Sequence, residues 1–397
     1  MDIQNFSALF NTPARREAFL KLIKDNKTKH IFIQGLEGSS IALFFSNLLE
    51  HKQAHILIAN DLDEAGYLYN DLVQINSNDH ILLFPSGYKR DIKYGQPDPP
   101  SEILRTEVLN RLCQKGESLL IVTYPEAIAE KVVPVNMLSE QTLHIDKNSK
   151  CDIITLSDKL RERGFEEVDY VYEPGQFAVR GSILDVFSYT NELPYRIDFF
   201  GKEVESIRTF EVETQLSTGK LEEVYIVANV CGQEASGISI LDFIDKNTIL
   251  ICHNLSWVID RISTIASESL SEQTLIAEEG DRYAMQKIID VTAFQKKITT
   301  FRRIDYGANS EANTPAVIRF NCAPQGVYHK NFDLVSQSFS QFIEKGYTLY
   351  ILSDSEKQIE RLQAIFEERG DSISFTPVLK TLHEGFVDND LKIGCFT

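Results

Sequence analysis

The sequence predicts an α/β protein: a parallel-sheet domain carries an inserted small α+β domain and is followed by a small C-terminal α/β domain. In the first third, short apolar runs alternate with helical patterns, which indicates a parallel sheet covered on both faces. Closely spaced strands and turns replace this pattern over 133–213 and indicate an antiparallel sheet. The α/β pattern then returns over 214–315 and again over 316–397.

The first part of the parallel-sheet domain covers residues 1–132. Helical periodicity is found over Ile41–Leu49 and Asp63–Val73. The segment Pro85–Pro100 is rich in Gly, Pro, Asp and Tyr and predicts a loop of a length often used functionally. The predicted strands are the apolar runs His30–Gln34, His55–Ala59, Ile81–Phe84 and Leu119–Val122.

The inserted domain combines one helix with a meander of short strands. The helix is predicted over Leu156–Gly164, with the glycine as its C-cap. Turns at Gly181, Asn191–Pro194 and Gly201-Lys202 separate the strands. These strands are Phe177–Arg180, Ser182–Phe187, Tyr195–Phe200 and Val204–Phe210.

The remaining two segments again read as α/β. A buried strand at Thr248–Cys252 and a helix at Ser256–Ser267 belong to 214–315, and the small polar residues Asn309–Thr314 predict a linker. In 316–397 the expected elements are a strand at Gly346–Leu352 and a helix at Ser355–Arg369. The chain stops within a further apolar strand at Lys392–Thr397, which leads us to expect a piece of a longer protein.

Composition and charge narrow the function classes. Hydrophobic residues make up 43% and charged residues 25%, the balance of a globular protein. Neither a membrane-spanning run nor a secretory signal is found, so we expect a cytoplasmic protein without membrane contact. The net charge of −18 disfavours non-specific DNA binding. The pairs Arg15-Arg16 and Arg302-Arg303 are expected to be solvated surface.

The cysteines and histidines do not form a metal-binding pattern. None of the six cysteines lies in a C-x-x-C motif, and the pair His51 and His55 has no second pair to complete a site. We therefore expect no metal and reduced thiols.

The turn after the first strand lies where a phosphate-binding loop would lie. The working motif G-x-x-x-x-G-K-[ST] uses its lysine on the β- and γ-phosphates and its hydroxyl on Mg²⁺. Here Ser40 replaces the last glycine, Ile41 the lysine and Ala42 the hydroxyl residue, and Glu37 would bring a carboxylate near the phosphates. The degenerate nucleotide loop comprises Gly35, Gly38, Ser39, Ser40, Ile41 and Ala42.

Nucleotide hydrolysis also needs an acidic pair at the end of a buried strand. The strand Thr248–Cys252 is followed instead by His253-Asn254, and neither side chain can polarise a metal or act as the base. We therefore expect no catalytic residues and no ATP or Mg²⁺ cofactor in this chain. The simplest alternative is that the turn is an ordinary strand–turn–helix connection.

The densest motif runs over Glu173–Ser188, continues through Pro194–Phe210 and ends at Glu213–Ser217. It resembles the module shared by UvrB and the bacterial transcription-repair coupling factor Mfd. The pattern R-G-x-[IL]-[LIV]-D-[VIL]-F, followed by R-[IV]-[ED]-x-F and E-[SR]-[IL]-R-x-F, is long and specific. The resemblance covers essentially the whole chain and is weakest over 231–310.

Two observations favour the N-terminal region of Mfd over UvrB. UvrB keeps an intact ATP-binding loop, whereas Mfd proteins have lost it, and the segment Asn331–Leu362 looks like the third domain of Mfd, which UvrB lacks. The resemblance implies a degenerate, helicase-like domain 1 in two parts (1–132 and 214–315). It also implies an inserted UvrA-binding domain 2 (133–213) and a third domain (316–397).

The function implied by this resemblance is a UvrA-recruiting scaffold for transcription-coupled nucleotide excision repair. RNA polymerase and DNA would bind to parts of the family that follow Thr397, and the ATP-dependent translocase motor would lie there as well. One alternative is a UvrB-like ATP-dependent damage-verification enzyme. Another is a module that binds single-stranded DNA, but the aromatic residues are interleaved with acids and stacking platforms need a basic groove.

Arginines are the candidate UvrA contacts, because a guanidinium pairs bidentately with carboxylates. Arg180 matches the second arginine of the F-R-x-R-G motif through which UvrB contacts UvrA, while Ala178 replaces the first. A further family arginine falls near Glu166-Glu167, so the binding chemistry is only partly carried over. The other candidates are Arg163, Arg196 and Arg208. Between 151 and 215, seven basic residues stand against fourteen acidic ones, which favours a protein partner over DNA.

Strand alternation makes a geometric prediction for Arg180. With Phe177 and Val179 facing inward, Ala178 and Arg180 face outward. The alternative is that Arg180 neutralises Asp185 or Asp198, and Arg196 and Arg208 fit cross-strand ion pairs equally well. The residues expected in the core are Phe177, Ile183, Leu184 and Phe187.

Overall fold

The structure is a computed structural model, which describes residues 1–397 except 26, 77–79, 89–97, 115, 141, 148–149, 190, 192, 229–236, 274–287, 309–315 and 330. Most of the predicted loop Pro85–Pro100 lies outside the described residues, as do the predicted linker Asn309–Thr314 and Cys231.

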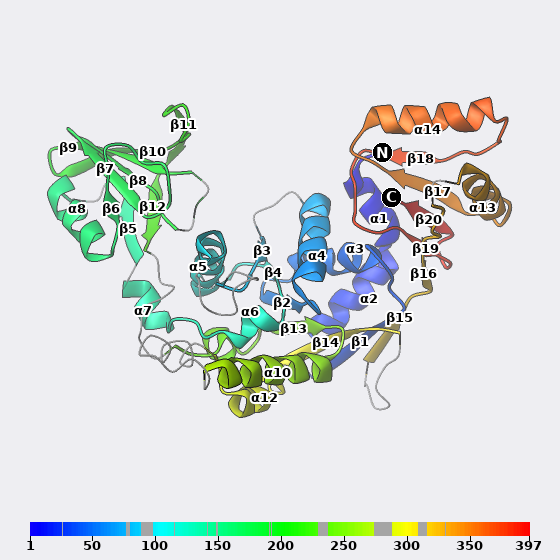
Figure 1. The fold of residues 1–397 in the computed structure, drawn as a ribbon, viewed down its shortest axis with the longest axis horizontal. Helices are drawn as coiled ribbons and strands as arrows, with labels where there is room; N and C mark the ends of the chain where they lie inside the picture. The colour runs from blue at the N-terminus through cyan, green and yellow to red at the C-terminus, as the bar shows by residue number, and fades with distance from the viewer. Residues whose placement is uncertain are drawn as a thin grey trace.

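A seven-stranded sheet forms the centre of the molecule (Figure 1), and all of its neighbouring strands pair in parallel, as the apolar runs predict. The strand order is β15-β1-β14-β13-β2-β4-β3, so the early strand β1 lies between two strands from far along the chain. The strands are β1 (His30–Gln34), β2 (Ala54–Ile58), β3 (Ile81–Leu83), β4 (Leu119–Thr123), β13 (Ile249–Cys252), β14 (Arg302–Gly307) and β15 (Ala316–Arg319).

Helices cover both faces of this sheet. On one face lie α1 (Ile3–Phe10), α2 (Pro13–Lys24), α3 (Ser40–Phe45) and α4 (Leu62–Ile75), and on the other α10 (Leu255–Gln273) and α12 (Val291–Ile298) (Figure 1). The predicted helix Ile41–Leu49 is α3 continued by a 3₁₀ turn over Ser46–Glu50. Further helices are α5 (Pro99–Cys113), α6 (Pro125–Ala129), α7 (Val135–Glu140) and α9 (Ile240–Phe243). No described helix is both long and apolar enough to cross a membrane.

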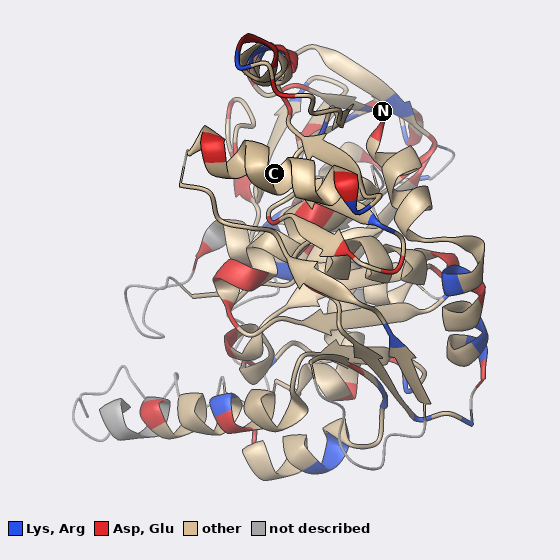
Figure 2. Ribbon diagram, turned by 90° about the vertical axis from the view of Figure 1, so that its right-hand side faces the viewer, with Lys and Arg blue, Asp and Glu red and all other residues tan. Residues whose placement is uncertain are grey.

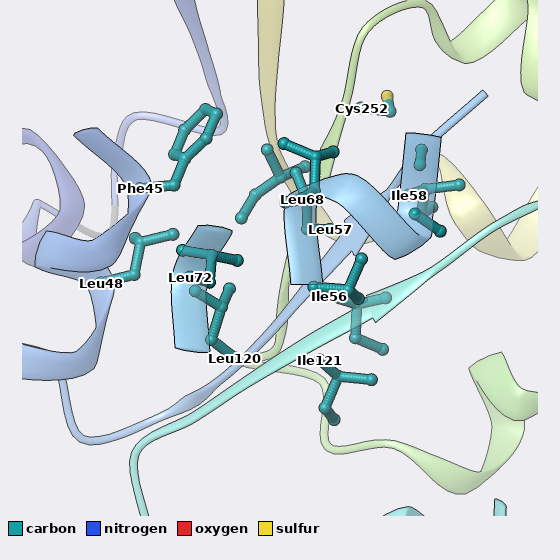
Figure 3. Packing of buried hydrophobic residues seen from close by; sticks show 14 of the residues in the cluster. Phe45, Leu48, Ile56, Leu57, Ile58, Leu68, Leu72, Leu120, Ile121 and Cys252 are labelled. Atoms are coloured by element: carbon teal, nitrogen blue, oxygen red, sulfur yellow. The ribbon is translucent and has the colours of Figure 1, made fainter. Parts of the chain in front are cut away.

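The side chains of the central strands alternate between two buried layers (Figure 3). Leu57 and Leu120 point toward Leu68 and Leu72 of α4, whereas Ile56 and Ile121 point to the opposite face. These six strand and helix residues are all buried. The sheet is thus apolar on both sides, as continuous Ile, Leu and Val runs require.

The inserted domain is a separate body at one end of the molecule (Figure 1). Its six-stranded sheet has the order β11-β10-β9-β8-β7-β6 and confirms the predicted meander. The helix α8 (Ile153–Glu162) and the antiparallel pair β5 (Thr142–Asp146) and β12 (Glu223–Val227) pack on one face of it. The sheet strands are β6 (Glu166–Glu167), β7 (Gln176–Arg180), β8 (Ile183–Val186), β9 (Tyr195–Phe200), β10 (Glu203–Phe210) and β11 (Ser217–Leu221).

A third unit follows β15, which itself belongs to the large sheet although the predicted third domain begins at residue 316. This unit packs against α1 (Figure 1), with the Phe6 and Tyr350 rings 5.1 Å apart and the Phe10 and Phe386 rings 5.3 Å apart. Its five-stranded sheet has the order β16-β19-β20-β17-β18. Its elements are β16 (Cys322–Pro324), α13 (Phe332–Glu344), β17 (Thr348–Leu352), α14 (Glu356–Glu368), β18 (Thr376–Val378), β19 (Phe386–Asp388) and β20 (Ile393–Phe396).

The expectation that both arginine pairs are solvated surface is wrong for three of the four residues. Arg15 forms a 2.6 Å ion pair with the buried Asp388 of the third unit. Arg302 donates to the carbonyls of Ile23 and Asp25 at the end of α2, and Arg303 pairs with Asp305 at 3.0 Å. Only Arg16 is half exposed, where it pairs with Glu50. The partners of Arg15 and Arg302 lie far away in the sequence, so a local pattern does not show them.

The pair His51 and His55 lies at the start of β2, with 3.2 Å between His51 Nδ1 and His55 Nε2. Burial lowers the pKa of His55 to about 3. Among the described residues, no group of three or more His, Cys, Asp or Glu side chains could hold a metal ion. His55 is therefore a neutral core residue at neutral pH, held by the Leu119 carbonyl at 3.3 Å from Nδ1.

This burial predicts a pH dependence of stability. The unfolded chain protonates His55 near pH 6.5 and the folded chain only near pH 3, so its contribution to the free energy of unfolding falls as the pH drops through this window. The limiting slope is about 1.4 kcal/mol per pH unit. His55→Gln should flatten the fall measured by urea unfolding between pH 7 and about 5, and the exposed control His329→Gln should not. Equal slopes in both variants would contradict the assignment.

Candidate functional site

The small sheet of the inserted domain has one apolar and one polar face. Phe177, Leu184 and Ile197 pack on α8 and the β5–β12 pair. The opposite face, called the outer face below, carries the charged residues Arg180, Asp185, Arg196, Asp198 and Arg208. Three of the four predicted arginines therefore lie together on one surface.

The strand alternation predicted for β7 places Arg180 on the correct face of the sheet. It does not predict correctly which of the neighbouring residues are buried. Val179 shares the face of Phe177 and is 37% exposed, whereas Ala178 lies on the outer face and is buried against Val171 and Phe187. A small apolar cluster thus covers part of the outer face, so exposure there does not follow from alternation alone. Of the predicted core residues, Phe177, Leu184 and Phe187 are buried and Ile183 is half-buried.

Asp185 is the centre of the outer face, and its side chain has no exposed surface. Arg196 pairs with it bidentately, with Nε 2.7 Å from Oδ1 and one terminal nitrogen 2.8 Å from Oδ2. This hydrogen bonding raises the pKa of Arg196. Its guanidinium also lies 4.4 Å from the centre of the Phe210 ring. A further nitrogen of Arg196 donates to the Gln215 carbonyl at 3.0 Å, so three independent contacts hold this side chain.

Arg180 also pairs with Asp185, from the end of β7 beside Gly181. Its side chain remains 35% exposed, and its guanidinium lies 4.9 Å from the centre of the Tyr170 ring. The ion pair suggested as the alternative role of Arg180 is thus present. Arg180 reaches Asp185 through one terminal nitrogen, so this ion pair uses only part of its five N–H donors.

Arg208 occupies the position opposite Arg196 on the neighbouring strand. Like charges opposite each other destabilise a sheet, but each arginine here has its own carboxylate. Arg208 pairs with Asp198, which also accepts from Ser206 at 3.0 Å. The ion pairs therefore alternate across the strands and fix the arginine side chains in place.

Arg163 lies apart from the other three. It ends α8 on the apolar side of the sheet and donates to the carbonyls of Lys159 at 3.2 Å and Glu140 at 3.0 Å. The structure therefore does not bring it to the outer face.

Phe200 belongs to this surface and was missed by the sequence reasoning. It ends β9, lies on the outer side two residues beyond Asp198, and is 78% exposed. Its neighbour Phe199 is buried on the opposite side. The sequence does contain a sign of this exposed residue: two consecutive phenylalanines in a strand point to opposite faces, so only one of them can face the core.

The degenerate nucleotide loop keeps its turn geometry. Gly35 and Gly38 adopt positive φ angles of 82° and 53°, and the Glu37 N–H donates to Ser40 Oγ at 2.9 Å. At the other expected nucleotide position, Asn254 accepts from the Trp257 N–H at 3.1 Å and so belongs to the first turn of α10. The loop lies in the central domain, well separated from the outer face (Figure 1).

The geometry predicts unequal roles for two arginines in stability. Arg196→Ala would leave the buried Asp185 carboxylate with only Arg180, and we expect a loss of about 3 kcal/mol in the free energy of unfolding. Arg180→Ala should cost about 1 kcal/mol or less, since the bidentate partner stays. Urea unfolding of both variants measures the difference. Equal losses would show that Asp185 does not depend on Arg196.

Known proteins match this chain in two ways. Residues 143–230 match the family described as UvrB interaction domain. The chain is 20% identical over 422 residues to the transcription-repair-coupling factor of Staphylococcus epidermidis, covering 90% of this chain and 35% of the relative. It is 22% identical over 400 residues to that of Staphylococcus aureus, covering 85% and 34%. The chain thus spans about a third of the length of these curated relatives.

These matches confirm the resemblance seen in the sequence: residues 143–230, which contain the outer face, match the UvrB interaction domain, within a chain that is similar over most of its length to transcription-repair-coupling factors.

Proposed function

We propose that this chain is a UvrA-recruiting scaffold of transcription-coupled nucleotide excision repair. The observation that carries the proposal is the outer face, which presents Arg180, Arg208 and the exposed Phe200 within the matched residues 143–230. Interface anchors are enriched in arginine and aromatic residues. The partner that fits is a protein surface with carboxylates around an apolar pocket.

The ion pairs prepare this surface for binding. Asp185 and Asp198 hold Arg180 and Arg208 in fixed positions while about a third of each side chain stays exposed. A side chain that is already ordered loses less entropy on association. The surrounding acidic excess argues against a nucleic acid as the ligand, because phosphate binding needs uncompensated cations.

Substitutions on the outer face should weaken UvrA binding more than they weaken the fold. Arg180→Ala and Phe200→Ala should each lower the affinity for UvrA at least about tenfold, measured by calorimetry, with little change in melting temperature. Ile154→Ala is the matched control, because Ile154 is 71% exposed on α8, on the opposite side. Unchanged affinity for both outer-face variants would remove this surface from the proposal, and failure of the unaltered chain to bind UvrA would remove the function.

The second candidate is a UvrB-like ATP-dependent damage-verification enzyme. Against it stand Ile41 and Ala42 at the lysine and hydroxyl positions, which leave no cation for the phosphates and no hydroxyl for Mg²⁺. We expect no ATP binding by calorimetry with Mg²⁺ at protein concentrations of tens of micromolar. Micromolar affinity would favour the enzyme.

Under this proposal RNA polymerase and DNA are partners of the longer protein. Figure 2 shows acidic and basic residues interspersed over the described helices and loops. The net charge of the whole sequence is −18. We therefore expect no shift of duplex DNA by low-micromolar protein in about 150 mM salt, conditions in which weak surface electrostatics are screened. A clear shift at this salt concentration would show a DNA site on the chain itself.

A further inference from the structure

The degenerate nucleotide loop is in contact with the third unit. The Ser39 N–H donates to the Glu384 carbonyl at 3.0 Å, and the Glu384 N–H donates back to Ser39 Oγ at 3.0 Å. In a working phosphate-binding loop, backbone N–H groups of this kind hold phosphate oxygens. Here a carbonyl oxygen from residue 384 takes an N–H of the loop instead.

Two residues of α4 complete the contact. Asp71 is buried and accepts from Ser39 Oγ at 2.5 Å and from the His383 N–H at 2.7 Å, so one carboxylate joins both units. The Tyr67 ring stacks on the His383 ring, with 3.4 Å between centroids and 7° between planes. The segment Leu382–Phe386 is therefore fixed to both the loop and the helix that follows β2.

Gly38 shows that the two backbones touch. A Cβ atom at this position would lie 2.8 Å from the Gly385 carbonyl oxygen and 3.1 Å from that of Glu384. In the nucleotide motif this position is variable, so phosphate binding does not demand a glycine there. The close approach of residues 384 and 385 does demand one.

We propose that the turn Gly35–Ser40 is a docking site for the segment Leu382–Phe386 of the same chain, and that nucleotide and this segment exclude each other. The Glu384 carbonyl occupies the hydrogen-bonding direction that a phosphate would need. The Glu384 side chain also passes beside Gly38, where its Cγ lies 3.4 Å from a Cβ built at that position. The turn has thus become a protein-binding element that joins the first and third units.

Hydrogen exchange tests the docking from the loop side. Gly38→Ala should speed the exchange of the His383 and Glu384 amides at least about tenfold, because the added methyl displaces the opposing backbone. Gly370→Ala is the matched control, since Gly370 also has a positive φ of 74° but nothing lies within 4 Å of its Cβ position. Equal exchange at residues 383 and 384 in both variants would overturn the proposal.

A second pair of variants, with smaller changes, tests the docking if Gly38→Ala does not fold. Ser39→Ala removes the acceptor of the Glu384 N–H and the donor to Asp71. Ser46→Ala is the control, because it removes another buried hydroxyl, which donates to the Leu43 carbonyl of its own unit. Faster exchange at His383, whose own acceptor is untouched, is expected only in Ser39→Ala. Unchanged exchange at His383 would overturn the docking.

A restored loop tests the exclusion. The triple variant Ser40→Gly, Ile41→Lys and Ala42→Thr regains the motif, and its ATP binding is measured by calorimetry while exchange at residues 383 and 384 is followed. Absence of binding, or binding together with release of these amides, supports the proposal. ATP binding with both amides still protected would overturn it. None of these outcomes depends on UvrA, so the docking and the proposed recruitment can fail separately.

Discussion

A carboxylate that leaves water must find partners within the fold, and this constraint fixes the main junctions of the molecule. Asp305 in the large sheet is bound by His30 and Arg303, and burial raises its pKa. Asp185 holds the arginines of the small sheet. Asp71 and Asp388 join the first unit to the third. In a chain with a net charge of −18, arginines thus bind three of these buried acids, Asp185, Asp305 and Asp388.

The elements of the fold could be predicted because their signals are local. The strand that became β2 and the helix that became α4 each show their period within a few residues. What joins these elements could not be predicted in the same way. Arg15 pairs with a residue 373 positions away, and β15 pairs with β1 rather than with the third unit that follows it. Contacts between residues so far apart produce no pattern within a short stretch of sequence.

The candidate site shows the same division. The motif led to Arg180, Arg196 and Arg208, and the structure brings these three together. Arg163 lies on the other side of the sheet, at the end of α8. The sequence could not predict this, because the position of a residue just after a helix does not tell which face of the sheet that helix covers. Phe200 could have been found from strand alternation, because its neighbour Phe199 faces the core and consecutive side chains point to opposite faces.

The pairing of β5 with β12 has a consequence for how this architecture arose. Thr142 and Val227 are register partners at the boundary of the inserted domain, so the points where the chain enters and leaves lie about 5 Å apart. A gap of that size can be bridged by two or three residues. The inserted domain can therefore be added to a host chain, or removed from it, without a change in the strand order of the host sheet. A binding surface carried by such a domain can in the same way be combined with host folds of different function.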